Sequence, residues 1–334
     1  MITIKVSTSN PELSYLFLRQ TSEGHSIWGD CQFMINQTIK RCDWWVICHA
    51  SALQQPGTAV CDPDHIVYIS MEPTEKGLPA AFFKQFSQLV LCDRSVSHPH
   101  ILYTNGLTWW VGMKVRHENG HHFSPDSTLN YDSLKALAPP LKQNRISVVC
   151  SKNQSLPGHT KRLTFLEKLM AHPVSQYIDL FGGGYIPIPD KWDAIAPYKY
   201  HLVLENSVVQ DYWSEKLGDA FLCYAYPVYY GCPNITSYFK AESLITIDIE
   251  NFDQTVAVLE NLLSDDKYAD YLPAIIDARN KVLDDYNIFQ LMADICHEPA
   301  KSFKKCKLKP VNHFQRLWSR RVARQIIYRL FGIK

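Results

Sequence analysis

The sequence predicts an α/β protein built from two Rossmann-like halves, and three features support that prediction. Its 334 residues are enough for two domains, since a domain has about 150 residues. Short apolar runs alternate with helix-compatible segments, which is typical of a parallel sheet covered by helices. A polar stretch at 118–144, rich in His, Ser, Asp and Pro, separates two such series. With 46% hydrophobic and 20% charged residues, the composition excludes a disordered chain and a fibre.

The first half, residues 1–140, is expected to begin with a strand. Residues 2–7 alternate between apolar and polar side chains, which is the period of a strand. Further strands are predicted where short apolar runs follow, at 44–50, 65–70 and 88–93. A helix-compatible segment at 79–88 lies between two of these runs. Strands that alternate with helices favour a parallel, doubly wound sheet.

The second half, residues 141–300, repeats this alternation. Strands are predicted at 145–151, 177–184, 198–206, 227–231 and 243–249. Helices are predicted at 161–170, 214–225, 251–263 and 268–296. The resulting order again indicates a Rossmann-like unit, and ligands bind such sheets beyond the carboxyl ends of their strands.

The charge is divided unevenly along the chain. No acid follows Glu298, and residues 301–334 carry eleven lysines and arginines, so 23 bases face 33 acids in the remainder. We therefore expect an acidic body with a basic tail at 301–334. Within it, arginines recur every fourth residue opposite an apolar face that includes Trp318 and Phe331.

This pattern predicts a basic amphipathic helix at 313–334, through which residues 311–334 would bind an anionic membrane surface. Docking on the protein's own core and formation of a homodimer are alternatives. Nucleic-acid binding is the weakest of them, because the acidic body would repel phosphate groups.

The cysteines and the N-terminus favour a cytoplasmic protein, and the basic tail favours a peripheral position on the inner face of the cytoplasmic membrane. Ten cysteines are scattered without paired spacing, which indicates reduced, buried thiols. The sequence shows no secretory signal and no apolar run of about 20 residues that could span a bilayer.

No metal site is expected. Asp62 and Asp64 form a D-x-D triplet, but they precede a strand as a turn, and His117, His121 and His122 lie in the polar boundary segment. Solvated histidines are the more common outcome there. Trp109 and Trp110 are expected in the core or on the wall of a binding cleft.

The strongest functional signal lies at 198–231. A strand ends at Glu205 and Asn206, and a polar loop then leads to Glu215 and Lys216 at the start of a helix. A helix N-terminus and a lysine favour an anion such as a pyrophosphate, and Glu215 could accept hydrogen bonds from ribose. An ordinary capping box, with exposed charges, is the alternative. The glycine triplet at 182–184 is a weak signal by itself.

The run LENSVVQDYWSEKLGDAFLCYAYPVYYGCP at 204–233 resembles the signature of the α1,3-fucosyltransferases of glycosyltransferase family 10, and it is closest to the bacterial members. In that family an F-E-N triplet is followed by Y-x-T-E-K and then by P-[VI]-x-x-G. The resemblance extends over 145–263, through FGGG at 181–184 and SLITIDIENFD at 243–253.

The resemblance implies a GT-B fold, in which two Rossmann-like domains face a cleft. It assigns the donor site to Arg162, Asn206, Tyr212, Glu215 and Lys216. Arg162 and Lys216 would neutralise the phosphate of the departing GDP, and Glu215 would bind ribose. Asn206 and Tyr212 would line the phosphate and sugar site. Lys161 beside Arg162 leaves open which of the two points inward, and Arg162 is favoured. The chemistry implied requires no cofactor and no metal.

An inverting transfer also needs a general base, which takes the proton of the attacking hydroxyl. Residues 68–74 resemble the family's strand-end E-S-P segment and place Glu72 at the catalytic position, with Glu75 as the second candidate. A surface glutamate ahead of a proline turn is the alternative for Glu72.

The function implied is transfer of L-fucose from GDP-fucose to an oligosaccharide acceptor. The expected target is O3 of GlcNAc or Glc in a surface glycan such as the lipopolysaccharide O-antigen. Transfer from another GDP-sugar and a non-catalytic glycan-binding role are the alternatives.

Overall fold

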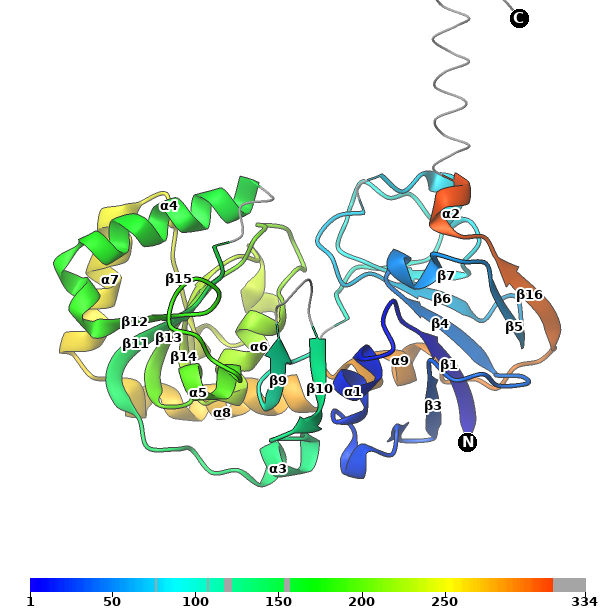
Figure 1. The fold of residues 1–334 in the computed structure, drawn as a ribbon, viewed down its shortest axis with the longest axis horizontal. Helices are drawn as coiled ribbons and strands as arrows, with labels where there is room; N and C mark the ends of the chain where they lie inside the picture. Colours follow the sequence, from blue (N-terminus) through cyan, green and yellow to red (C-terminus); the bar gives the residue numbers. More distant parts are fainter. Residues whose placement is uncertain (76, 107, 117–121, 153–156, 315–334) are drawn as a thin grey trace, which may run out of the picture. The chain divides into compact units, whose positions relative to one another are not determined.

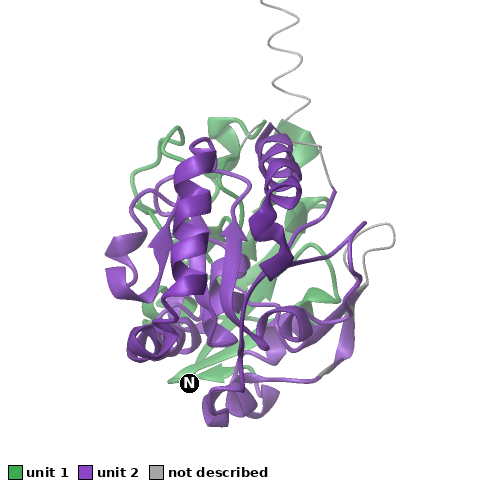
Figure 2. Ribbon diagram, turned by 90° about the vertical axis from the view of Figure 1, so that its left-hand side faces the viewer, with its two compact units in different colours: residues 1–14, 26–106, 292–334 green, residues 15–25, 107–291 purple. Residues whose placement is uncertain are grey.

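The computed structural model describes residues 1–75, 77–106, 108–116, 122–152 and 157–314 (Figure 1). These residues form two compact units (Figure 2). Unit 1 contains residues 1–14, 26–106 and 292–334, and unit 2 contains residues 15–25 and 107–291. The helix α1 (Leu13–Leu18) crosses from unit 1 to unit 2.

Unit 1 is built on a seven-stranded sheet with the order β2-β3-β1-β4-β6-β7-β8. Its strands are β1 (Ile2–Ser7), β2 (Ile27–Trp28), β3 (Cys31–Ile35), β4 (Trp44–Cys48), β6 (Ile66–Ile69), β7 (Gln88–Val90) and β8 (Ile101–Leu102). All neighbours pair in parallel except β2 with β3. Every residue of β4 and β6 is buried, as expected for central strands of a parallel sheet.

Aromatic rings fill the core of unit 1 on the side of α2 (Ala80–Phe83). Phe82 and Phe83 pack edge-on against Tyr68 of β6. Phe314, after β16 (Lys304–Leu308), packs edge-on against Phe82. Strand β16 pairs antiparallel with β5 (Gly57–Cys61), and its lysines point outward while Cys306 and Leu308 are buried.

The C-terminal region therefore differs from the separate tail expected at 301–334. Residues 304–308 form a strand of unit 1, because Cys306 and Leu308 alternate with lysines and supply an apolar face. The predicted basic helix at 313–334 falls almost entirely on residues 315–334, which lie outside the described residues.

Unit 2 is built on a fully parallel five-stranded sheet with the order β12-β11-β13-β14-β15. Its strands are β11 (Gln143–Val149), β12 (Ile178–Phe181), β13 (Tyr198–Leu204), β14 (Tyr226–Tyr230) and β15 (Ile245–Thr246). The helices are α4 (Pro157–Ala171), α5 (Lys191–Ile195), α6 (Glu215–Leu222), α7 (Phe252–Ser264) and α8 (Tyr268–Leu283), followed by α9 (Ile288–Ile295), which leads into unit 1. Helices α4 and α7 lie on one side of the sheet and α8 on the other (Figure 1).

The strand order of unit 2 reverses between β11 and β13. The chain leaves β11 through α4 toward β12, and it leaves β13 through α6 toward β14 on the opposite flank. Parallel sheets bind ligands at such a switch point, beyond the carboxyl ends of the two strands.

The boundary segment predicted at 118–144 is part of unit 2 where it is described. It contains the helix α3 (Tyr131–Ala136) and the strand β10 (His122–Ser127), which pairs with the preceding strand β9 (Met113–Arg116). Buried polar contacts hold this region: Asp190 accepts hydrogen bonds from Gly112 N and Thr128 Oγ1, each at 2.9 Å. The unit boundary at residue 107 thus lies upstream of the expected boundary at 140, because the ladder and these bonds belong to unit 2.

Several smaller expectations can be compared directly with the structure. All ten cysteines are buried and none forms a disulfide, which confirms the predicted free thiols. Asp62 forms a turn, with Oδ1 accepting from Asp64 N, and Oδ2 accepting from Ser302 Oγ at 3.0 Å. His122 is in β10, whereas His117 and His121 lie outside the described residues. Trp109 is fully buried in the core of unit 2.

In the part of the chain that the structure describes, no helix is long and apolar enough to cross a bilayer. The same residues contain no group of three or more His, Cys, Asp or Glu that could hold a metal ion.

Candidate functional site

A pocket of about 620 Å³ lies beyond the carboxyl ends of β13, β14 and β15 in unit 2. We call it the strand-end pocket. It is lined by the first turn of α4, the residues after the three strands and the segment before α7: Gly158, Lys161, Asn206, Val208, Tyr229, Tyr230, Gly231, Cys232, Pro233, Thr246, Ile247, Asp248 and Glu250. Its place matches the ligand position expected for a parallel sheet.

Helix α4 approaches the end of β13 closely at Gly158. A Cβ atom at this position would lie 1.8 Å from the carbonyl oxygen of Asn206, so any larger residue would force the helix and the strand apart. Pro157 starts the helix, where its missing N–H costs nothing. The first turn of α4 is therefore set directly against the floor of the pocket.

One turn further along α4, Arg162 points into the protein. Its side chain is 4% exposed, and Nη1 donates to the carbonyl oxygen of Leu204 at 3.1 Å. Its Nε has no hydrogen-bond partner among the described residues. Lys161 instead points outward and pairs with Glu250 at 2.7 Å on the rim of the pocket. Of the two neighbouring cations, Arg162 is the buried one.

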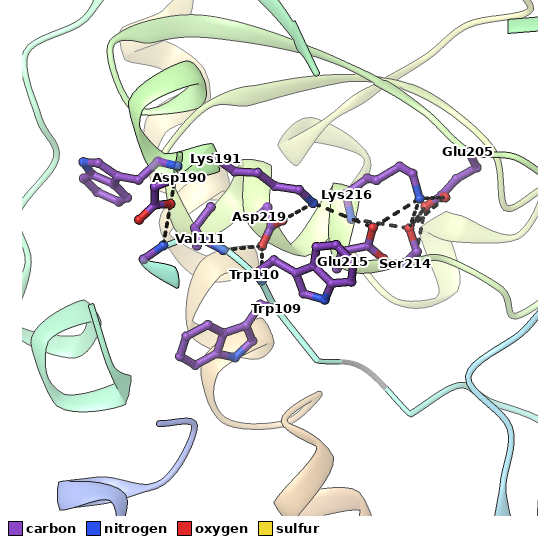
Figure 3. Close-up of polar contacts among 12 residues, drawn as sticks. Trp109, Trp110, Val111, Asp190, Lys191, Glu205, Ser214, Glu215, Lys216 and Asp219 are labelled. Carbon is purple, nitrogen blue, oxygen red and sulfur yellow. Dashed lines mark hydrogen bonds and ion pairs between the residues drawn. The ribbon is translucent and has the colours of Figure 1, made fainter. Parts of the chain in front are cut away.

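The N-terminus of α6 carries a compact polar cluster (Figure 3). Glu205 is fully buried and accepts hydrogen bonds from Ser214 N and Ser214 Oγ, both within 2.9 Å. Ser214 caps the helix, and Lys216 Nζ lies 3.0 Å from Ser214 Oγ and 3.4 Å from Glu205 Oε2. Gly231 leaves room for Glu205, since a Cβ there would lie 2.5 Å from Glu205 Cγ. The cluster fixes the lysine at the start of the helix.

Charges of opposite sign surround Glu215 on two sides. Lys216 Nζ is 3.3 Å from Glu215 Oε1, and Lys191 Nζ is 3.7 Å from the same oxygen. Burial by itself would raise the pKa of Glu215, but the two ammonium groups outweigh it and bring the pKa down to about 2. Burial also opposes the charge of Lys216, but Glu215 and Glu205 raise its pKa above the usual value. Both groups are therefore ionised at neutral pH.

Arg162 and Lys216 lie close enough to act on common neighbours. Burial lowers the pKa of His159, and the positive charges of Arg162 and Lys216 lower it further. The charge of Arg162 also opposes the ionisation of Lys216 itself. Two like charges near one another are unfavourable unless anions neutralise them, and Glu205 and Glu215 do so for Lys216 here. Arg162 from α4 and Lys216 from α6 both lie at the end of β13, where Arg162 donates to Leu204 and Lys216 contacts Glu205.

Asn206 and Tyr212 lie on the loop between β13 and α6. Asn206 is half-buried and lines the strand-end pocket, and its Oδ1 has no hydrogen-bond partner within the described residues. Tyr212 is 9% exposed. The loop is held at Asp211, whose φ of 65° places it in the left-handed region; Oδ1 of Asp211 accepts from Asn234 Nδ2 at 2.8 Å.

The base candidates Glu72 and Glu75 lie after β6 in unit 1. The side chain of Glu72 is exposed, and its backbone N–H donates to Ser70 Oγ at 3.1 Å. Glu75 is buried and accepts a hydrogen bond from Tyr68 at 3.0 Å. Burial raises the pKa of Glu75 despite the hydrogen bonds that it accepts. The strand end thus offers one exposed carboxylate and one buried carboxylate.

Sequence reasoning did not identify three members of the charged cluster: Lys191, Glu205 and Asp219. Glu205 stands directly before Asn206 in the strand-end pair, so a signal for it was present. Asp219 follows Glu215 by one helical turn on the same face of α6, which is a weaker signal. Lys191 reaches the cluster only through the fold, from the start of α5.

Comparison with known proteins agrees with this geometry. The family model described as glycosyltransferase family 10 (fucosyltransferase), C-terminal, matches residues 139–306. The alpha-(1,3)-fucosyltransferase FucT of Helicobacter pylori is 28% identical over 131 residues, which are 37% of this chain. The matched part covers 25% of that relative's length.

Two crystal structures of alpha1,3-fucosyltransferase, one of them with GDP, resemble the fold. Each is 16% identical, has a TM-score of 0.51 and covers 86% of this chain, over 91% and 92% of their own lengths. At this identity the likeness concerns the fold alone, an α/β, GT-B-like arrangement with two parallel sheets. The predicted fold class is confirmed to that extent.

The matched region runs from the start of the second parallel sheet to β16 and contains every donor residue assigned by motif. It covers half of the chain, which is enough to assign the family. The resemblance predicted from the strand-end motif is therefore confirmed: this chain belongs to glycosyltransferase family 10.

Proposed function

We propose that this protein is an inverting transferase that moves L-fucose from GDP-fucose to a hydroxyl group of an oligosaccharide. Family membership supports the reaction class, and the similar fold solved with GDP supports a guanosine nucleotide as ligand. The observation that carries the proposal is the pair of cations at the end of β13: Arg162 donates to the carbonyl oxygen of Leu204 at 3.1 Å, and Lys216 Nζ lies 3.4 Å from Glu205 Oε2. A diphosphate bound between them would neutralise their mutual repulsion.

The reaction forms one bond and breaks another. The acceptor oxygen bonds to the anomeric carbon of fucose while the bond from that carbon to the phosphate oxygen breaks, and its electron pair leaves with GDP. Arg162 and Lys216 would stabilise the charge that develops on the leaving phosphate, which is the larger part of the barrier in such a transfer. Glu215, ionised and at the first position of α6, would accept hydrogen bonds from the ribose hydroxyls. Asn206 and Tyr212 would contact the phosphate and the sugar.

The proton of the acceptor hydroxyl needs a carboxylate to receive it. We assign this role to Glu72, because it is exposed at a strand end, where it can reach an acceptor and then lose the proton to solvent. Glu75 is the second candidate, but its burial and its hydrogen bond with Tyr68 favour a structural role.

Two fixed cations can serve the function that a divalent metal has in other transferases. We therefore propose that the reaction requires no cofactor and that a chelator such as EDTA leaves the transfer rate unchanged. A rate that falls with EDTA and returns with magnesium would contradict this.

The acceptor and the location are proposed from the sequence. We propose O3 of GlcNAc or Glc in a surface glycan such as the lipopolysaccharide O-antigen as the target. The basic C-terminal region would hold the protein on an anionic cytoplasmic membrane surface. Val311 and Phe314 pack in the core of unit 1, so the appropriate truncation ends at residue 314. It should abolish binding to anionic liposomes and preserve transfer to a soluble acceptor; unchanged liposome binding would contradict the membrane role.

The donor assignment is tested by measuring the released nucleoside diphosphate, which is GDP from GDP-fucose and GDP-mannose and UDP from UDP-galactose, each with and without a GlcNAc-containing acceptor. Acceptor-dependent release from GDP-fucose is expected. Turnover of another GDP-sugar alone would move the assignment to that donor, and GDP binding without any turnover would indicate a glycan-binding protein.

Lys216→Met should lower kcat/KM by about 10²–10³, the usual effect of removing one charge-stabilising group. Lys199→Met is a matched control, because Lys199 has the same residue type, lies in the same unit and pairs with Asp266 at 2.6 Å.

A further inference from the structure

We propose that Lys191 is a positioning residue of the donor site, which shares the carboxylate of Glu215 with Lys216 so that more of the charge of Lys216 remains available to the diphosphate. The inference rests on the proposed function. It concerns a residue that makes no contact with the strand-end pocket and that acts through Glu215 (Figure 3).

Lys191 is held from several sides. It is the first residue of α5, next to the helix cap Asp190, and its side chain is 19% exposed. Its Nζ lies 2.7 Å from Asp219 Oδ2 and 4.8 Å from the centre of the Trp110 ring. A lysine side chain is normally mobile, but the ion pair with Asp219 and the contact with the face of the Trp110 ring restrict it here.

The partner of Lys191 is itself fixed by the backbone. Asp219 is fully buried, and its Oδ1 accepts hydrogen bonds from Trp110 N at 2.7 Å and from Val111 N at 3.1 Å. Burial raises the pKa of Asp219, and the charge of Lys191 opposes this. Because Asp219 is anchored in this way, it fixes the position of the Lys191 ammonium group beside Glu215.

Lys191 and Lys216 share Glu215 between them. They lie 3.7 Å and 3.3 Å from the same oxygen, Glu215 Oε1. Without Lys191, Lys216 would remain as the cation beside this oxygen, and the two groups would close into a tighter ion pair. That pair would neutralise the lysine and turn Glu215 away from the ribose.

The charge balance of the cluster leads to the same expectation. Glu205, Glu215 and Asp219 contribute three negative charges, and Lys191, Lys216 and Arg162 contribute three positive charges. Loss of Lys191 leaves a net charge of −1 beside the position proposed for the diphosphate. The expected consequence is weaker binding of GDP, and not only a less stable fold.

A purely structural ion pair is the competing explanation, in which Lys191 does no more than neutralise Asp219. The double variant Lys191→Met/Asp219→Asn separates the two. It removes both buried charges, so a structural role predicts recovery of both folding and GDP affinity. If Lys191 acts through Glu215, the double variant folds but still binds GDP weakly.

The test is isothermal titration calorimetry with GDP on the full chain, with thermal melting of each variant. Lys191→Met is expected to bind GDP at least about tenfold more weakly, in the range found when one partner of a buried charge pair is removed. Lys191→Arg should recover most of the lost GDP affinity. Lys199→Met is the control, because Lys199 has the same 19% exposure, and it should bind GDP as the wild type does.

A second comparison identifies the path of the effect. Glu215→Gln should itself weaken GDP binding, and Lys191→Met should then add little further loss, because its effect passes through Glu215. The inference, but not the proposed function, would be overturned if the folded Lys191→Met variant or its double variant with Asp219→Asn bound GDP with wild-type affinity. Full additivity of Lys191→Met with Glu215→Gln would overturn it as well. Failure of the wild-type protein to bind GDP would overturn the proposed function and the inference together.

Discussion

The carboxyl ends of the two parallel sheets differ in how their charges are held. In unit 2, the carboxylate that follows β13, Glu205, is buried and takes part in a connected cluster with Ser214 and Lys216. In unit 1, the carboxylate after β6 belongs to Glu72 and is exposed. Among the described residues, the hydrogen bonds of Glu72 join its backbone N–H and carbonyl oxygen to Ser70 Oγ. One sheet end is a preassembled charged site, and the strand end after β6 presents one exposed carboxylate beside the buried Glu75.

This contrast fits two different tasks. A nucleotide diphosphate is the same in every turnover, so a rigid arrangement of charges can be built for it in advance. Such an arrangement needs several residues at fixed spacing, which is why unit 2 carries a recognisable motif. A general base needs only one accessible carboxylate near the acceptor, and the sequence around it is correspondingly less constrained.

The largest expected effect tests the simpler of the two sheet ends. Glu72→Gln keeps the shape of the side chain and removes its capacity to accept a proton. We expect kcat to fall by about 10²–10⁴, the range typical of general-base catalysis, while calorimetry shows unchanged GDP affinity.

Glu75→Gln is the matched variant for that experiment. It should lower stability and leave most of the activity, since Glu75 is buried against Tyr68. If Glu75→Gln abolishes turnover and Glu72→Gln does not, then the assignment of the base is wrong and Glu75 takes the role.

A smaller effect tests how closely unit 2 is preassembled. Gly158→Ala places a Cβ 1.8 Å from the carbonyl oxygen of Asn206, so α4 must shift and carry Arg162 with it. Overpacking of this kind costs about 1–3 kcal/mol, and GDP binding should weaken in parallel.

Gly183→Ala provides the control, because the nearest atom to its new Cβ would be 3.8 Å away. Chemical denaturation and calorimetry on both variants measure the two effects. Equal GDP affinity in both variants would show that the contact between α4 and β13 does not set the geometry of the site.

The same contrast explains what the sequence could and could not predict. The strand expected at 198–206 is observed as Tyr198–Leu204, because seven residues of strand pattern leave little ambiguity. The strand at Lys304–Leu308 was assigned to a charged tail, because its lysines conceal the alternation of Cys306 and Leu308. Long-range pairing with β5 decides its structure, and that pairing has no local signal.

The site shows the same limit. Glu215 and Lys216 belong to one short motif, and their placement at the start of a helix was predictable from it. The network around them was not, because Lys191 is 24 residues before Glu215 in the chain and meets it only when α5 and α6 pack side by side. A motif identifies the groups that contact a ligand, whereas the residues that orient them come from the tertiary structure.

The smallest expected effect concerns the polar groups buried in the sheet of unit 2. His201 on β13 is buried, and its Nδ1 lies 2.7 Å from Ser147 Oγ on β11. Burial, followed by the charges of Lys191 and Lys142, lowers the pKa of His201 to about 3. An unfolded histidine has a pKa near 6.5, so the unfolded chain binds the extra proton between these two values.

The free energy of unfolding should therefore decrease as the pH falls below 6.5, by up to about 1.4 kcal/mol per pH unit from this residue, and level off near pH 3. His201→Asn, which keeps a hydrogen-bonding group near Ser147, should remove that slope, whereas exchange of the exposed His297 should not. Urea denaturation between pH 7.5 and 5.5, with hydrogen exchange to separate the two units, measures the slope. If unit 2 of the His201→Asn variant keeps the full pH dependence of its unfolding free energy, other buried groups of this sheet cause the acid sensitivity. The loss of stability at low pH then originates closer to the proposed donor site.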